Sequence, residues 1–212
     1  MATTTTHYGF DIPQSTDLVK DGATAIATLG QDIDTAMNTA LGTKKAGMVL
    51  LNTTSFSGVA SQSISDVFSA TYRNYLVVFD ITTATATSGL QMRMRVSGAD
   101  NSNSEYRYNS ITAADTSATI ATSRSNGTNT LFDDIGRIDN GFGSSGFINF
   151  FSPFATNRTR ISGQSSGGQT SDVNALRSYT GNLTVTTSYT GFTLIAASGN
   201  ITGEASVFGY NA

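Results

Sequence analysis

The chain has 212 residues and a formal net charge of −3, and only 13% of its residues are charged, about half of the quarter that is usual in soluble proteins. Its 12 Lys and Arg residues are scattered along the sequence, so we expect no nucleic-acid partner. The absence of cysteine and the single histidine exclude disulfides, thiol catalysis and the ligand sets that zinc prefers, and we expect no cofactor.

Residues 1–14 are rich in threonine, contain Pro13 and show neither helical nor strand periodicity. We expect an extended arm there, either a tether that docks on another protein or a disordered leader. The arm lacks the basic start and the apolar stretch of a secretory signal, and no apolar run approaches the roughly 20 residues that span a bilayer. We therefore expect a protein that is made in the cytoplasm and does not insert into membranes.

Residues 15–46 carry the clearest periodic pattern. Polar and acidic residues at 15–17 favour the start of a helix, and Gly42 and the lysines after it suit a helix end. The pattern predicts a helix over residues 16–41, roughly 40 Å long. Apolar or small residues at alternating spacings of three and four form the a/d seam of a coiled coil: Val19, Gly22, Ile26, Leu29, Ile33, Ala36 and Ala40.

The seam has two possible partners, the chain's own β domain or the same helix in other copies. We favour self-association, and thus an oligomer interface along the seam, because the helix is long, precedes the whole domain and keeps its heptad phase over about three repeats. Ile and Leu at the seam favour two strands, but the small Gly22 and Ala36 weaken that rule. The seam alone leaves dimer and trimer open.

From Gly47 onward the periodicity changes to two, which is typical of strands. Leu90, Met92, Met94 and Val96 alternate with polar residues, and this run predicts a half-buried strand. The run at 73–81 is apolar on both sides and predicts a central strand with both faces covered. Further strands are expected at residues 48–51, 64–69, 105–111, 129–135, 147–151, 158–162, 173–179, 192–196 and near the C-terminal end of the sequence.

The fold class expected from these runs is mainly β, an antiparallel sandwich of jelly-roll type preceded by the coiled-coil helix. The polar stretches 112–128 and 163–172 are expected to be loops. The domain organisation is an arm at 1–14, an oligomerisation helix at 15–46 and a β-sandwich head at 47–212.

Residues that carry catalysis are not indicated. Residues 163–167 match the G-x-S-x-G pattern, but the strand-to-helix context is missing and His7 is the only histidine, so we interpret the match as chance. Asp80, Asp100, Glu105 and Glu204 can supply the acid pair of a glycoside hydrolase, yet nothing selects two of them. We assign no catalytic residue and expect a protein that is not an enzyme.

Two binding sites are considered. Asp133, Asp134 and Asp139 lie close together in the sequence and suit a Ca²⁺ ion, but turn aspartates beside a strand explain them better, so no metal site is assigned. Tyr106, Tyr108 and Tyr210 are candidate glycan contacts if they are exposed, because tyrosine rings stack on sugars. Tyrosine is also a common strand residue.

The N-terminal block HYGFDIPQSTDLVKDGATAIATLGQDID resembles a block near the N-terminus of many bacteriophage tail-fibre and minor tail proteins. The stretches SFSGVASQSISDVFSATYRNYLVVFDI, LQMRMRVSGADNSNSEYRY and ITGEASVFGYN resemble the strands of their jelly-roll heads. The resemblance implies a homotrimer in the virion, in which the arm anchors the chain to other virion proteins and the helices form a stalk. It places His7, Tyr8, Gly9 and Phe10 in the anchor and residues 19–40 in the stalk.

The leading hypothesis is a short tail-fibre or receptor-binding protein of the virion, which presents its heads to a host surface glycan or protein for host attachment. An alternative is a capsid decoration or head-fibre support protein with no receptor role. A polysaccharide depolymerase is a third hypothesis, which requires an acid pair that the sequence does not display.

Overall fold

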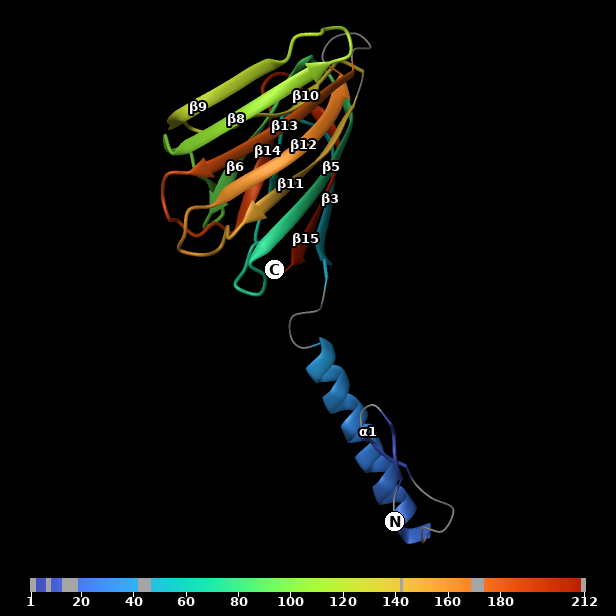
Figure 1. The fold of residues 1–212 in the computed structure, drawn as a ribbon. Coiled ribbons are helices and arrows are strands. Elements are labelled where there is room, and N and C mark those ends of the chain that lie inside the picture. The colour runs from blue at the N-terminus through green and yellow to red at the C-terminus, as the bar shows by residue number, and fades with distance from the viewer. Residues whose placement is uncertain are drawn as a thin grey trace. The chain divides into compact units, whose positions relative to one another are not determined.

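The computed structural model describes residues 3–6, 9–12, 19–41, 47–141, 143–168 and 174–210. The chain divides into two compact units, residues 1–46 and residues 47–212 (Figure 1). Over the described residues, no helix is long and apolar enough to cross a membrane.

The first unit contains one helix and a small ladder. Strand β1 (Thr3–Thr4) pairs antiparallel with β2 (Asp11–Ile12), so the arm forms local strand pairing that its sequence did not predict. Helix α1 spans Val19–Leu41, about 35 Å at 1.5 Å per residue, and contacts β2. The predicted helix began at residue 16, and residues 16–18 lie outside the described residues.

The second unit consists of two antiparallel sheets, and the mainly β fold expected from the sequence is confirmed. The larger sheet has the order β3 (Val49–Val59), β15 (Ile201–Tyr210), β5 (Asn74–Ala84), β11 (Ser144–Phe151), β12 (Arg160–Gly168), β13 (Asn174–Leu183), β8 (Tyr106–Ala114) and β9 (Ala121–Asn129). The smaller sheet has the order β10 (Phe132–Ile138), β6 (Ser88–Val96), β14 (Gly191–Ala196) and β4 (Ser61–Ile64), with β7 (Ala99–Asp100) paired to β6.

The hydrophobic core lies between the two sheets, which form the layers visible in Figure 1. Leu90, Met92 and Met94 on β6 are fully buried, as their alternation with polar residues predicted. The ring of Phe150 on β11 lies 5.5 Å from that of Phe192 on β14, so aromatic contacts join the larger sheet to the smaller one.

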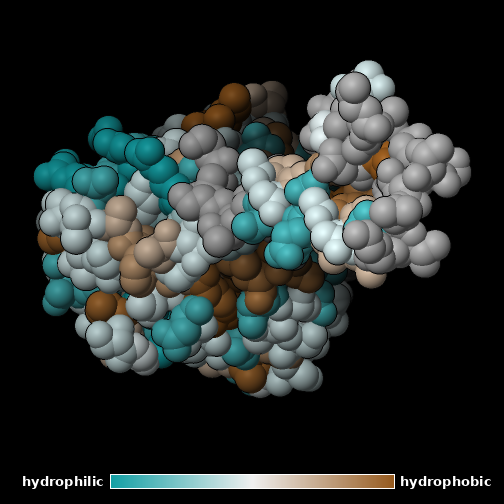
Figure 2. All heavy atoms as spheres, turned by 90° about the horizontal axis from the view of Figure 1, so that it is seen from below, coloured by the Kyte–Doolittle hydropathy of each residue, from teal (hydrophilic) through white to brown (hydrophobic). Residues whose placement is uncertain are grey.

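Strand β5 is central, as predicted, but only one of its faces is covered. Tyr75, Val77, Phe79 and Ile81 point into the core, whereas Val78 on the other face is 43% exposed. The expectation of two covered faces is therefore wrong: only one sheet packs against β5. Figure 2 shows other hydrophobic residues at the surface among hydrophilic ones.

The segment at 64–69, expected to be a strand, is mostly a loop between β4 and β5. Its backbone bonds to another loop, because Val67 N and Phe68 N both donate to Thr190 O at 2.9 and 3.0 Å. The Phe68 ring packs 5.0 Å from that of Phe150. Apolar residues here close the core without joining a ladder.

Both polar stretches expected to be loops contain strands. Strand β8 continues to Ala114 and β9 covers residues 121–129, while β12 runs through residues 160–168. The hydrogen bonds of a β-ladder come from the backbone. Serine, threonine and glycine can therefore form them just as apolar residues can. The expectation failed because the inward side chains of these strands are small rather than apolar.

Candidate functional site

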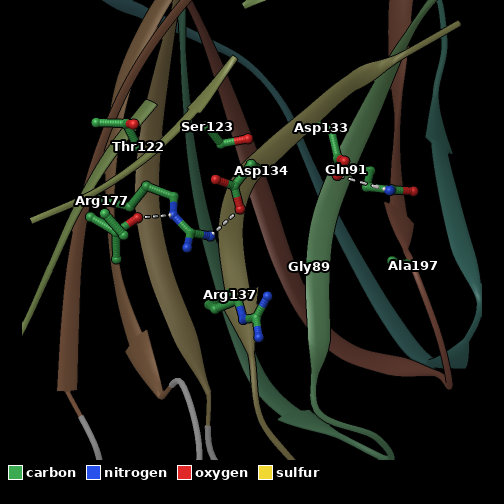
Figure 3. A pocket seen from close by; sticks show the side chains of 11 residues that line it. Gly89, Gln91, Thr122, Ser123, Asp133, Asp134, Arg137, Arg177 and Ala197 are labelled. Carbon is green, nitrogen blue, oxygen red and sulfur yellow. Dashed lines mark hydrogen bonds and ion pairs between the residues drawn. The ribbon is translucent and has the colours of Figure 1, made fainter. Parts of the chain in front are cut away.

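A polar pocket of about 400 Å³ opens where strands of the two sheets approach each other (Figure 3). Strands β6 and β10 of the smaller sheet line one part of it, and β8, β9 and β13 of the larger sheet line another. Its charged and polar side chains include Gln91, Ser123, Asp133, Asp134, Arg137 and Arg177. We call it the arginine pocket.

Arg177 forms the buried wall of the arginine pocket, on β13, with 5% of its surface exposed. Its Nε donates to Thr112 Oγ1 at 2.9 Å, and one terminal nitrogen donates to Gly136 O at 3.1 Å. The same nitrogen lies 2.6 Å from Asp134 Oδ1 in an ion pair. Burial lowers the pKa of Arg177, and Asp134 opposes that effect, so the guanidinium is a fixed cation with its main donors engaged.

Asp134 reaches Arg177 because the β10 ladder is irregular. The register between β10 and β6 shifts between Phe132 and Gly136, and Asp134 takes a left-handed backbone conformation with φ of 70°. A bulge redirects the side chains of its strand. The left-handed backbone conformation is energetically unfavourable for a residue with a Cβ. Ser110 Oγ donates to Asp134 Oδ2 at 2.7 Å, and this bond and the ion pair hold the carboxylate against the larger sheet.

Among the described residues, neither Asp133 nor Arg137 takes part in a direct ion pair, although Asp133 lies close enough to Arg177 to act on its pKa. Asp133 Oδ1 accepts a hydrogen bond from Gln91 Nε2 at 2.9 Å, a neutral donor. The Nε of Arg137 is shielded from solvent and has no hydrogen-bond partner among the described residues. Figure 3 shows Arg137 near Asp134 and Arg177 with no interaction drawn to it. Its charge also contributes to lowering the pKa of Arg177, so the two cations are close enough to interact.

The two candidate glycan tyrosines on β8 are buried, which corrects the expectation that they are exposed. Tyr106 is 0% and Tyr108 6% exposed, because the period of β8 turns both toward the core. The hydroxyl of Tyr106 donates to Asn101 O at 2.7 Å. Neither ring is open to stack on a sugar. Tyr210 on β15 is half-buried, and its hydroxyl lies 3.4 Å from Asn149 Oδ1.

The three aspartates considered for calcium have separate partners. Asp134 pairs with Arg177 and Asp133 accepts from Gln91. Asp139 is buried and accepts a hydrogen bond from the backbone of Asn140 at 2.8 Å. Within the described parts of the chain, no three acidic or histidine side chains are grouped as a metal site would require.

Two of the four acids considered for glycoside hydrolysis face each other. Asp80 on β5 lies directly opposite Glu204 on β15, and both are exposed. Each accepts a hydrogen bond from a serine, Asp80 from Ser145 at 2.6 Å and Glu204 from Ser55 at 2.9 Å. Asp100 pairs with Arg95, and Glu105 accepts from Asn101 at 2.9 Å. The four do not converge on the arginine pocket.

The G-x-S-x-G match lies within β12, between β11 and β13 of the larger sheet. Ser165 is buried there. A nucleophile elbow needs an exposed serine on a sharp turn between a strand and a helix, whereas this serine lies in an antiparallel ladder.

The predicted anchor is described only in part. His7 and Tyr8 lie outside the described residues. Gly9 takes φ of 67°, and its N donates to Thr5 O at 3.0 Å. Phe10 N donates to Thr5 Oγ1 at 3.0 Å. These bonds connect Thr5 with the two residues that precede β2.

The predicted interface residues lie on α1. Ile26 is 66% exposed, and Ile33 and Ala40 are also exposed. Gly22, Leu29 and Ala36 are half-buried. Val19 lies in the first turn, and its side chain is outside the described set.

The sequence reasoning missed Gln91, Arg137 and Arg177 as site residues. The sequence pattern gave one indication for Arg177: it alternates with Ala175 and Tyr179, the residues of β13 that point inward. A charged residue that points inward needs a buried partner, and the partner here comes from a distant, bulged strand.

Comparisons with known proteins identify no relative of this chain. No protein-family model matches, and no match was found among curated proteins or solved structures.

Proposed function

We propose that this chain is a structural protein of a bacteriophage virion, of the short tail-fibre or receptor-binding type. In this proposal the N-terminal arm anchors the chain to other virion proteins. The helix joins three copies as a coiled coil, and jelly-roll heads are presented for host attachment. The proposal draws on the resemblance of the N-terminal block and head strands to tail-fibre and minor tail proteins.

The observation that carries the proposal is the partly exposed apolar stripe of α1. Ile26, Ile33 and Met37 are all exposed, although most of the stability of a helix in a protein comes from packing its apolar face. Three-four spacing of the seam residues suits packing against like helices. Copies joined in this way gain affinity for a surface through multivalency, without requiring a tight single site.

A capsid decoration or support protein is the second candidate, and the open face of the larger sheet favours it. Val78 lies opposite Phe147, and Phe208 lies opposite both Leu50 and Leu76. Leu50, Val78 and Phe147 are exposed. A contiguous apolar face of this kind is typical of contact with another protein.

Microscopy of the virion separates the two candidates. We expect antibodies against the β unit to label a tail or fibre tip, and labelled full-length chain to bind host cells. Labelling spread over the capsid lattice, without cell binding, would favour the support protein. No labelling of particles at all would refute both.

A further inference from the structure

The arginine pocket holds a guanidinium N–H that no described residue accepts, the Nε of Arg137. Arg137 Nε is shielded from water and lacks a hydrogen-bond acceptor within the described residues, and the nearby Arg177 has the same charge. Arg177 is already paired with Asp134. Arg137 itself is half-buried, but a shielded N–H without an acceptor is costly, so a ligand that brings an anionic oxygen to this Nε gains a charge-assisted hydrogen bond that the described residues do not supply.

The other polar groups that line the arginine pocket are mostly hydrogen-bond acceptors and neutral donors. Asp133 Oδ1 accepts a hydrogen bond from Gln91, and a carboxylate has acceptor capacity for several donors. Thr122 adds a hydroxyl on β9, and so does Ser123, whose side chain also bonds to that of Tyr108. A ligand that suits this set carries one anionic group and several hydroxyls.

These features select against other anions. The two carboxylates, Asp133 and Asp134, repel a multiply charged phosphate or sulfate. No aromatic side chain is among the described residues that line the pocket, so a nucleobase has no ring to stack on. A volume of about 400 Å³ lies in the range of small-molecule sites.

We propose that the arginine pocket binds a carboxylate-bearing sugar. The carboxylate binds the Arg137 guanidinium, for which a planar two-oxygen group is the matching geometry, and the sugar hydroxyls donate to Asp133 and bond to Gln91 and Ser123. This assignment rests on the proposed host-attachment function, since acidic sugar on a cell surface is the ligand such a head would meet.

Titration of the full-length protein with glucuronate, glucose and acetate tests the assignment. Glucose retains the ring and hydroxyls, whereas acetate retains the carboxylate. We expect glucuronate to bind at least tenfold more tightly than either. If acetate binds as tightly as glucuronate, the pocket is a simple anion site. If glucose binds as tightly as glucuronate, the carboxylate plays no part in recognition. Either result overturns the proposal.

Arg137→Met is the decisive variant, with Arg160→Met as its matched control on the exposed face of β12. We expect at least a tenfold loss of glucuronate affinity for Arg137→Met, a smaller loss for Arg137→Lys, and no change for Arg160→Met. Arg137→Met should melt no lower than the wild type, because the Nε has no bond to lose. If it fails to fold, Arg137→Gln replaces it, with a similar loss expected because the amide carries no positive charge.

The two proposals fail in different ways. Host-cell binding that persists in Arg137→Met, together with no glucuronate binding, would overturn the sugar assignment and leave the attachment function standing. Glucuronate binding that depends on Arg137, in a protein that labels no virion, would refute the attachment function and keep the pocket assignment.

Discussion

Gly163 is a position on β12 at which the fold has no room for a side chain. A Cβ there would meet the backbone oxygen of Phe147 and the hydroxyl of Tyr179. These two groups are hydrogen-bonded to each other at 3.0 Å. The aromatic ring of one strand thus occupies the space left by a glycine of its neighbour.

We expect Gly163→Ala to lower the free energy of unfolding by about 1 to 3 kcal/mol, the usual cost of overpacking. Urea denaturation measures the change. Gln164→Ala, at the next and exposed position of β12, is the control and should change stability by less than about 0.5 kcal/mol. A Gly163→Ala protein as stable as this control would show that the strand can shift to admit a methyl group.

Buried tyrosines make stability depend on alkaline pH. Burial raises the pKa of Tyr106 and of Tyr179 above the usual value of about 10. The folded state therefore holds the phenolic protons more tightly than the unfolded chain. Their contribution to stability is complete below about pH 10 and is lost as the pH rises above it.

We accordingly expect the melting temperature to fall as the pH rises above about 10. Tyr179→Phe should melt lower than the wild type at neutral pH, because Phe147 O loses its donor. It should also show a shallower alkaline fall. An alkaline slope unchanged in both Tyr179→Phe and Tyr106→Phe would mean that other groups cause the pH dependence.

At the scale of elements, α1 is the part of the chain whose sequence pattern and surroundings disagree most. Its apolar seam residues Ile26 and Ile33 are exposed, whereas Thr28 and Thr35 on the polar side donate to carbonyls of their own helix at 3.0 and 2.8 Å. An amphipathic helix gains its stability from burying the apolar face.

We expect Ile26→Ser with Ile33→Ser to dissociate the assembly and to reduce helical content, because two seam contacts per copy are lost. Thr28→Ser with Thr35→Ser has the same spacing on the other side and should leave the mass unchanged. Circular dichroism and light scattering on both proteins make the comparison. Equal masses for the two variants would place the copy-to-copy contact elsewhere.

The strands that the sequence predicts are those whose inward residues are apolar. Leu90, Met92 and Met94 identify β6 because their alternation has no other explanation. Strand β12 was missed because Gly163, Ser165 and Gly167 fill its inward positions, and these residue types also predominate in turns. Only the neighbouring Tyr179 and Ser144 explain why small residues are needed there.

The arginine pocket was beyond sequence reasoning for a related reason. Arg177 on β13 and Asp134 on β10 are 43 positions apart, and they meet only because a bulge turns Asp134 toward the larger sheet. The register of an antiparallel pair is set by turns and packing over its whole length. A one-residue shift in β10 would place Asp134 on the other face.

At the scale of the whole molecule, the proposed attachment function needs two kinds of surface in one chain. The first unit carries a helix with exposed apolar residues, and the second carries a polar pocket in which the Nε of Arg137 has no acceptor among the described residues. In the proposed function, assembly through the helix would bring several copies of the pocket together, so that weak contacts to a sugar-coated surface add up to retention. Loss of assembly should therefore reduce attachment to cells much more than it reduces binding of a free sugar.

The mass of the full-length protein in solution tests the central claim most directly. One chain has a mass of 22.2 kDa, and multi-angle light scattering on a dilution series measures the assembled mass without assuming a shape. The proposed trimer predicts a stable mass three times that of one chain. This mass should fall to that of a single chain in the Ile26→Ser, Ile33→Ser variant. A folded wild-type protein that remains a single chain at every concentration would contradict it.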